Sequence, residues 1–369
     1  MNHWIVALDD GPVAGPRLAV KDAIDVAGVP TTVGCKAIAD AAAPAVQDAP
    51  CVATARAAGA RIVGKANLHE LCFGTTGLNP TFGDPVNPRW PGRVPGGSSS
   101  GSAVAVTLDE ADVAYGTDTG GSVRLPAACC GVAGLKTTHG RIALDGVWPL
   151  SPSLDTVGPI ARDVAGLTLG MQLLEPGFSV DGVTAAPLVG WLTTPPAVHI
   201  DEAMDAAVSR ALRASGLAVE DVSLDAWDAC AHAFAVVIGY EAWQSDKELM
   251  DVPGGVHDYV GNRLRGCASV TQEAYLDGRR AQEAWTARVG ALLARVPVLA
   301  LPTLEAPPPG LDVGYLPNAL VYPFNLAGVP AISIPVGPGA GESIQLVAAA
   351  GGEELLLATA AVIEAAVAS

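Results

Sequence analysis

Two clusters of glycine and serine stand close together in the first third of the chain and hold the residues best suited to nucleophilic chemistry. They are residues 96–102 (GGSSSGS) and residues 116–122 (GTDTGGS). Ser122 follows Ser98 by 24 residues, which leaves room for one helix and one strand between the two loops. Two loops at the same edge of a sheet would bring both serines together. We therefore take Ser122 as the candidate nucleophile of a hydrolase.

The second cluster also offers backbone donors. Hydrolysis of an amide needs a nucleophile, a base that takes its proton, and hydrogen-bond donors for the oxyanion. Glycines allow consecutive N–H groups to turn toward one point, so we expect an oxyanion hole from Thr119, Gly120, Gly121 and Ser122. A phosphate-binding P-loop uses glycine similarly, but its Lys-Ser/Thr pair is missing here and Arg124 follows instead.

A competing motif lies in the first cluster. Residues 97–101 (GSSSG) match the GxSxG pattern of the α/β-hydrolase nucleophile elbow, which would make Ser99 the nucleophile of an esterase-like enzyme. That elbow requires a strand directly before it. Pro91 and Pro95 interrupt the preceding segment, so a central strand is not expected there. The Ser99 alternative is kept as the less favoured one.

The general base is harder to find from residue types alone. Histidine is the usual choice, but none of the six histidines carries a triad signature; they are His3, His69, His139, His199, His232 and His257. Residues 17–21 (RLAVK) form a short apolar segment that ends on Lys21. A lone lysine is usually a solvated surface residue, so Lys21 gains weight only from the family resemblance described next.

The sequence resembles the amidase signature family over nearly its whole length. The resemblance rests on residues 96–102, on residues 116–128 (GTDTGGSVRLPAA) and on residues 131–136 (GVAGLK). It extends to Lys21-Asp22, to residues 64–67 (GKAN) and to residues 324–331 (FNLAGVPA). This composite motif is far more specific than a single GxSxG.

The resemblance implies a Ser–cis-Ser–Lys triad in which Ser122 is the nucleophile, Ser98 the proton bridge and Lys21 the base. It also implies a cis peptide bond between Gly97 and Ser98. A base that works near neutrality needs a pKa of about 7–8, and burial at the end of an apolar strand would lower the pKa of lysine toward that range. No metal and no organic cofactor is implied.

The resemblance also points to residues around the substrate. Residues 69–76 (HELCFGTT) correspond to a segment that borders the acyl pocket in relatives. The expected substrate contacts are Cys72, Phe73, Gly74, Thr75, Gly97, Thr117 and Asp118. Ordinary core packing stays an equal alternative for Cys72 and Phe73. Arg124 could meet a substrate carboxylate, but we favour a role in bracing the nucleophile loop.

Predicted helices and strands alternate along the chain. Helices are expected at 45–58, 201–215, 270–295 and 353–367, with Asp201 as a cap and Gly216 as a stop. Strands are expected at 61–64, 112–115, 217–224, 296–301, 331–336 and 343–348. This order predicts an α/β fold with a large mixed sheet flanked by helices on both faces. We expect a single domain over 1–369, with a catalytic core at about 1–175 and 296–369, a more variable helical section at about 176–295, and a hinge near 175–190.

Composition excludes several classes of protein. The 369 residues carry a formal net charge of −17 and no run of Lys or Arg, which argues against a nucleic-acid partner. No stretch of about 18 apolar residues occurs, so no membrane span is expected. The seven cysteines are scattered, without a CxxC pair, and residues 1–4 do not start a signal peptide. We therefore expect a cytoplasmic protein with reduced cysteines, with a homodimer left open.

Three functions follow from these observations. The favoured one is an amidohydrolase that cleaves the carbon–nitrogen bond of a small carboxamide, with carbamates and urea-type bonds left open. The second is a glutaminase-type component of an amidotransferase that delivers ammonia to a partner. The third is a non-catalytic binding relative, which has no use for Lys21, Ser98 and Ser122 together.

Overall fold

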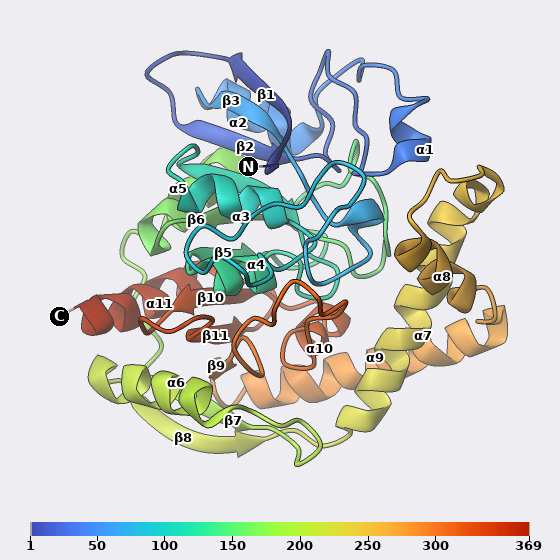
Figure 1. Ribbon diagram of the computed structural model, residues 1–369. Helices are drawn as coiled ribbons and strands as arrows, with labels where there is room; N and C mark the ends of the chain where they lie inside the picture. Colours follow the sequence, from blue (N-terminus) through green and yellow to red (C-terminus); the bar gives the residue numbers. More distant parts are fainter. Residues whose placement is uncertain (1, 369) are drawn as a thin grey trace.

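A single mixed sheet organises the computed structural model, which describes residues 2–368 (Figure 1). Its eleven strands within that range run in the order β1-β3-β2-β4-β6-β5-β10-β11-β9-β7-β8. The strands are β1 Trp4–Asp10, β2 Arg17–Lys21, β3 Arg61–Ala66, β4 Val113–Thr117, β5 Ala133–Lys136, β6 Val157–Ala161, β7 Leu188–Thr193, β8 Ala218–Ser223, β9 Val298–Pro302, β10 Ala331–Pro335 and β11 Ser343–Ala348.

Strand directions make the sheet mixed, as predicted. β2 pairs in parallel with β3 and β4, and β7 pairs in parallel with β8 and β9. The strands between these two groups, from β4 through β6, β5, β10 and β11 to β9, pair antiparallel. β1 closes one edge by pairing antiparallel with β3.

Helices cover both faces of the sheet. They are α1 Lys36–Ala39, α2 Pro50–Ala57, α3 Ser100–Thr107, α4 Arg124–Cys130, α5 Val164–Leu174, α6 Glu202–Ser215, α7 Trp227–Asp246, α8 Asp258–Cys267, α9 Gln272–Leu293, α10 Tyr322–Leu326 and α11 Glu353–Ala368, with 3₁₀ turns η1 Glu70–Cys72 and η2 Lys247–Asp251. The predicted fold class is thereby confirmed.

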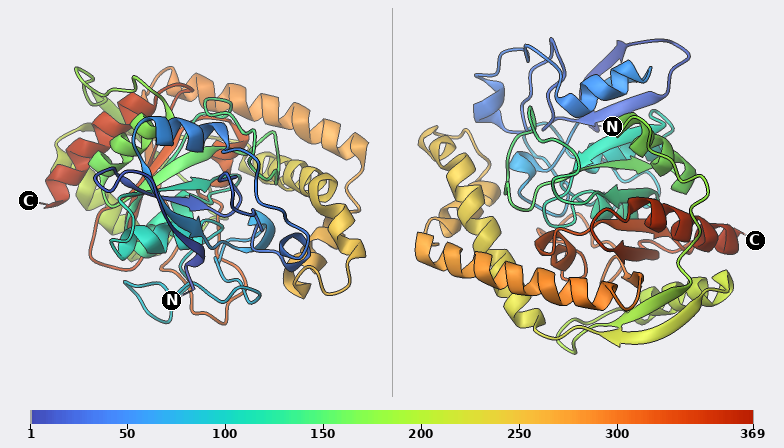
Figure 2. Two further views of the ribbon diagram at one scale, coloured as in Figure 1. Left: turned by 90° about the horizontal axis from the view of Figure 1, so that it is seen from above. Right: turned by 180° about the vertical axis from the view of Figure 1, so that it is seen from behind.

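Alternating side chains of the strands divide the core between the two faces. In β9, Val298 and Ala300 belong to the core cluster that also contains residues of α2, α5, α6 and α11, whereas Leu299 and Leu301 belong to the cluster that contains residues of α7, α8, α9 and α10. A smaller cluster under α3 and α4 contains Ala19 of β2. Helices α7, α8 and α9 lie together along one side of the molecule (Figures 1 and 2).

Local signals explain several of these elements. Asp201 caps α6 by accepting a hydrogen bond from the Ala203 N–H, and the helix ends at Gly216 in a left-handed conformation, as predicted. Thr271 caps α9 in the same way.

None of the helices within residues 2–368 combines the length and the apolarity that a membrane crossing requires.

Two parallel neighbours in the sheet position the candidate site. β2 ends at Lys21 and β4 ends at Thr117, and the register pairs Val20 with Tyr115, so both strand ends reach the same edge of the sheet. The second Gly/Ser loop follows β4 directly and leads into α4. The first loop leads into α3, which packs on β4.

Candidate active site

Lys21 lies at the centre of the site and is fully buried. Its Nζ donates to the Ser98 Oγ at 2.7 Å and to the Thr117 Oγ1 at 2.7 Å. Burial is the largest influence on this amine and lowers the pKa of Lys21, while Cys72, Asp118 and Asp155 act in the opposite direction. The side chain is therefore held against two hydroxyls in a setting that favours the neutral amine.

The Ser98 loop is fixed by hydrogen bonds to the 69–75 segment. The peptide bond between Gly97 and Ser98 is cis, as the resemblance implies. The Gly97 N–H donates to the Thr75 carbonyl at 2.7 Å, and the Ser98 carbonyl accepts from the His69 N–H at 2.9 Å. Ser98 itself is fully buried, so its hydroxyl is shielded from bulk solvent.

Ser122 is the least buried of the three candidate serines. It retains 7% of its surface, whereas Ser98 and Ser99 retain none. The Ser122 carbonyl accepts from the Ser99 N–H at 3.2 Å, which ties the two Gly/Ser loops together. The Ser99 hydroxyl instead donates to the Thr117 carbonyl at 3.3 Å. Ser99 also follows a loop and not a strand, so its geometry contradicts the nucleophile elbow.

The expected oxyanion donors need one correction. Gly121 adopts a φ of 115°, and its N–H donates to the Asp118 Oδ1 at 2.8 Å, so it is not free to meet an oxyanion. The Gly120 carbonyl accepts from the Asn318 Nδ2 at 3.0 Å, and the Thr119 hydroxyl donates to the Asp155 Oδ1 at 2.6 Å. The expected set is thereby reduced to the N–H groups of Thr119, Gly120 and Ser122.

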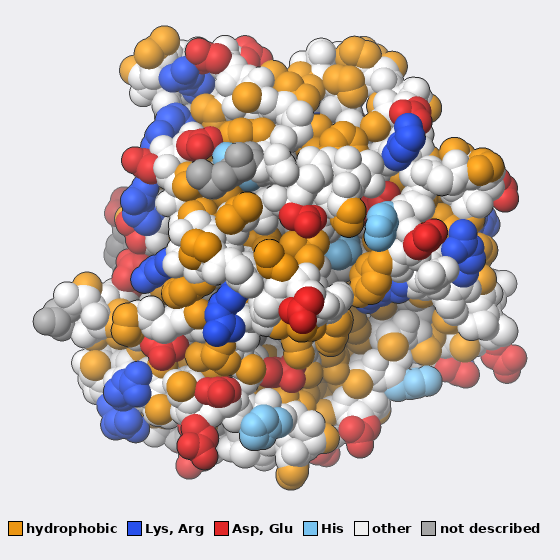
Figure 3. All heavy atoms as spheres, viewed as in Figure 1, with side chains coloured by type: hydrophobic (Ala, Val, Ile, Leu, Met, Phe, Trp, Pro, Cys, Tyr) orange, Lys and Arg blue, Asp and Glu red, His pale blue; other side chains and the backbone are white. Residues whose placement is uncertain are grey.

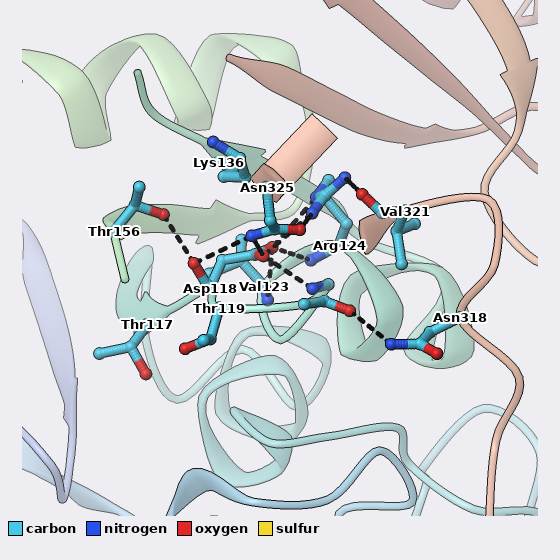
Figure 4. Close-up of polar contacts among 12 residues, drawn as sticks. Thr117, Asp118, Thr119, Val123, Arg124, Lys136, Thr156, Asn318, Val321 and Asn325 are labelled. Carbon is cyan, nitrogen blue, oxygen red and sulfur yellow. Dashed lines mark hydrogen bonds and ion pairs between the residues drawn. The ribbon is translucent and has the colours of Figure 1, made fainter. Parts of the chain in front are cut away.

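Asp118 and Arg124 form the polar network behind this loop (Figure 4). The Arg124 Nε and Nη2 donate to the two Asp118 oxygens at 3.0 Å each, and neither side chain is exposed. Asn325 joins them: its Nδ2 donates to Asp118 at 2.7 Å and its Oδ1 accepts from Arg124 at 2.6 Å. Arg124 also donates to the Val321 carbonyl and to Gln345. Arg124 therefore braces the nucleophile loop, as favoured above.

The same network corrects the expected role of Asp118. Burial alone would raise the pKa of this carboxyl, but Arg124 and Asn325 hold the pKa well below its usual range. Both oxygens are used inside the protein, one of them also by the Gly121 N–H and the other by the Val123 N–H at 3.1 Å. Asp118 thus shapes the turn before Ser122, and both of its carboxylate oxygens already accept hydrogen bonds from protein donors.

The 69–76 segment lies against the same centre. Leu71 and Cys72 both adopt left-handed φ values, 53° and 56°, which non-glycine residues rarely do. The Cys72 Sγ lies 3.9 Å from the Thr117 Oγ1. Thr75 accepts a hydrogen bond from the Leu316 N–H at 3.0 Å through its hydroxyl. Thr117, expected among the substrate contacts, holds Lys21.

A cavity of about 320 Å³ opens beside the nucleophile loop. Its walls come from Phe73, from α7, from α8 and from the segment before α10; the lining includes Phe234, Ile238, Arg263, Tyr315, Asn318 and Tyr322. Contact with the loop is close, because a Cβ added at Gly120 would lie 2.7 Å from the Phe234 ring. Figure 3 shows hydrophobic side chains gathered in a hollow on this face of the molecule.

Most of these cavity residues were not among the predicted contacts. Only Phe73 was named, and it is 2% exposed with the Arg263 guanidinium 4.1 Å above its ring centre. Asp155, which holds Thr119, was also missed. A lone arginine or asparagine in a helical or loop segment carries no sequence signal for a pocket.

Within residues 2–368, no group of three or more His, Cys, Asp or Glu is arranged to hold a metal ion.

Comparisons with known proteins agree with this geometry. The Amidase family profile matches residues 6–357. The chain is 36% identical to the A component of a glutamyl-tRNA(Gln) amidotransferase from Halobacterium salinarum, over 96% of each chain, and 32% identical to Amidase 1 of Oryza sativa, over 94% of this chain and 89% of that one.

Solved structures give the same result. A crystal structure of an amidase superposes with a TM-score of 0.89 at 31% identity and covers 99% of this chain and 92% of that one. A 6-aminohexanoate cyclic dimer hydrolase complexed with substrate also reaches 0.89, at 27% identity, over 100% and 91%. The chain therefore belongs to the amidase signature family and is a hydrolase that acts on carbon–nitrogen bonds.

Proposed function

We propose that the chain is an amidohydrolase that cleaves a small carboxamide through an acyl intermediate on Ser122. The observation that carries the proposal is the 2.7 Å hydrogen bond between the Lys21 Nζ and the Ser98 Oγ, both of which are fully buried. The loop that contains Ser98 is hydrogen-bonded to the backbone carbonyl of Ser122. Carbamates and urea-type amides fit the same chemistry, because each presents a carbonyl carbon to the serine and a nitrogen leaving group.

The proposed reaction begins with a proton relay. Neutral Lys21 takes the proton of Ser98 while Ser98 takes that of Ser122, and the Ser122 oxygen attacks the carbonyl carbon. The N–H groups of Thr119, Gly120 and Ser122 stabilise the oxyanion. The relay then returns the proton to the leaving nitrogen, the C–N bond breaks, and water hydrolyses the ester by the same steps.

Three alanine variants test the proposed roles. Ser122→Ala should abolish ammonia release and labelling by a fluorophosphonate probe, since it removes the attacking oxygen. Lys21→Ala should lose turnover while thermal unfolding shows an intact fold. Ser99→Ala is the matched control, because that buried hydroxyl only donates to the Thr117 carbonyl. Labelling that survives in Ser122→Ala and disappears in Ser99→Ala would sink the assignment.

A second function is favoured by the curated relatives that are named as components of glutamyl-tRNA(Gln) amidotransferase. In that role the chain would release ammonia from glutamine for a partner. Free glutamine carries both an ammonium and a carboxylate, and the cavity lining contains Arg263 but no Asp or Glu. Ammonia release from glutamine that exceeds release from simple amides would favour this second function.

A further inference from the structure

Among the described residues, Arg263 is the one cationic side chain in the lining of the cavity beside Gly120, and its environment is unusual for an arginine. It lies in the middle of α8, half-buried, with its guanidinium stacked 4.1 Å above the centre of the Phe73 ring. It forms no ion pair with any residue of the described range 2–368. An arginine that faces a cavity without a carboxylate partner is prepared to bind one from outside.

The other walls of the cavity carry no opposing charge. The polar groups are Asn318, Tyr315 and Tyr322, and the remaining lining is apolar or aromatic. Glu305 and Asp228 lie outside this lining but close enough to Tyr322 to add to the rise in its pKa that burial causes. The Glu305 Oε1 accepts a hydrogen bond from the Ala319 N–H at 2.9 Å. A substrate group in this cavity therefore meets one positive charge and no negative one from the residues that line it.

Hydrogen bonds fix the position of α8 relative to the nucleophile loop. Tyr259, one turn before Arg263, donates its hydroxyl proton to the Gly314 carbonyl at 2.6 Å. Next along the chain, the Tyr315 hydroxyl donates to the Asn318 Oδ1 at 2.8 Å, and Asn318 in turn donates to the Gly120 carbonyl at 3.0 Å. Asn318 thus links a cavity of about 320 Å³, which Arg263 also lines, to the backbone of the nucleophile loop.

We propose that Arg263 selects amides whose acyl part ends in a carboxylate and carries no amino group, such as the monoamides of small dicarboxylic acids. The inference rests on the proposed function, since it assigns the acyl group to this cavity. The planar guanidinium presents paired N–H donors that match a carboxylate, and the Phe73 ring holds that plane in place. A free α-ammonium on the acyl group would enter the same cavity without any anion to receive it.

Four probes separate the features of this proposal. Glutaramate is the monoamide with a terminal carboxylate, glutaramide replaces the carboxylate by a neutral amide of the same shape, pentanamide removes it, and L-glutamine adds an ammonium. Ammonia release should give a kcat/KM for glutaramate about 10- to 100-fold above that for glutaramide, the range expected for a charge-assisted pair. Succinamate and adipamate extend the comparison to other chain lengths.

The Arg263→Gln variant should lose that preference, so that its kcat/KM values for glutaramate and glutaramide become similar. Arg263→Lys should keep part of the preference, because it keeps the charge without the planar stack. Arg265→Gln is the matched control on the same helix, since Arg265 donates to Asn262. Thermal unfolding of each variant confirms that α8 remains folded.

Binding to the Ser122→Ala variant, measured by calorimetry, separates failure of this inference from failure of the proposed function. If the wild-type chain cleaves none of the probes but Ser122→Ala binds glutaramate more tightly than glutaramide and pentanamide, the hydrolytic proposal fails and the site assignment stands. Equal binding of glutaramate and glutaramide, or an equal loss for all probes in Arg263→Gln, overturns the role of Arg263.

Discussion

Replacing Arg124 by methionine should damage both the stability and the chemistry of the protein, because it leaves the Asp118 carboxylate buried without its cation. Arg124 donates to both Asp118 oxygens, to Asn325, to the Val321 carbonyl and to Gln345, and it has no exposed surface. Methionine is close in length but donates nothing. Asp118 would keep its hydrogen bonds from Asn325 and from the Gly121 and Val123 N–H groups.

The expected loss follows from the burial of the pair. Removing one partner of a buried ion pair destabilises a protein by about 3–5 kcal/mol. Unfolding entropy of about 2.1 cal/mol/K per residue corresponds to roughly 0.8 kcal/mol/K for a chain of this length, so the midpoint of thermal unfolding should fall by about 4–6 °C. Turnover should fall by about 100-fold, because the turn before Ser122 loses the anchor that aligns its N–H groups.

The stability lost in Arg124→Met should depend on pH, and the pKa of Asp118 determines the direction of that dependence. In the wild-type chain the pKa of Asp118 is held well below its usual range, so its stabilising contribution is present at neutral pH and is lost only in strong acid. Without Arg124, burial raises this pKa above that of the unfolded chain. The variant should then lose stability as pH rises, and its deficit should shrink when the pH is lowered toward 4.

Urea and thermal unfolding, combined with amide turnover, test this reasoning. Arg162→Met is the matched control, since Arg162 pairs with Asp109 at the surface and should contribute less than about 1 kcal/mol. Adding Asp118→Asn to Arg124→Met removes the unpaired charge and should recover at least about 1 kcal/mol. An Arg124→Met chain within about 1 kcal/mol of wild type, with normal turnover, would refute the structural role given to this pair.

Three further predictions concern Lys21, Asp246 and Gly120. Because burial lowers the pKa of Lys21, kcat/KM should rise with pH through one inflection below 10.5, and an inflection at or above 10.5 would contradict the role of Lys21 as base. Lys21→Arg should be inactive, because arginine cannot lose its proton in a protein. Burial raises the pKa of Asp246 to about 7, so the free energy of unfolding should fall as pH rises from about 4 to 7. In urea unfolding, Asp246→Asn should be as stable as wild type near pH 4 and more stable by up to about 4 kcal/mol at pH 8. Equal unfolding midpoints at pH 8 would count against this prediction. Gly120→Ala should lower kcat/KM at least about tenfold, because the added Cβ meets the Phe234 ring. Gly266 has open space around it, so Gly266→Ala should leave kcat/KM unchanged. Similar values for both variants would contradict the close contact between the cavity wall and the nucleophile loop.

Elements with marked periodicity or clear ends could be predicted from the sequence. The helix from 201 to 215 carries a capping Asp201 and a terminal Gly216, and its observed bounds match within a residue. Helix α7 was not predicted, because residues 227–246 are apolar on most sides and show little contrast between faces. Strands β1 and β7 were also missed; among the described strands, β1 pairs only with β3, which is distant in sequence.

The candidate site divides in the same way, and the division has a physical cause. Ser98 and Ser122 lie in Gly/Ser loops that the sequence marks by composition and spacing, whereas Lys21 was identified only through the family resemblance. The parallel pairing of β2 with β4 brings Lys21 to the edge of the sheet where it meets Ser98. The cavity is built from segments between 227 and 322 that meet only after α7, α8 and the 310–318 loop have packed against that edge. From the sequence alone, Arg263 resembles an ordinary surface arginine. What distinguishes it is the stacking of its guanidinium on the Phe73 ring and a cavity lining that contains no carboxylate. The Gly/Ser loops therefore predict the reaction type, whereas the acyl specificity that we propose depends on long-range packing. We expect substitutions between 227 and 322 to change the substrate without changing the chemistry.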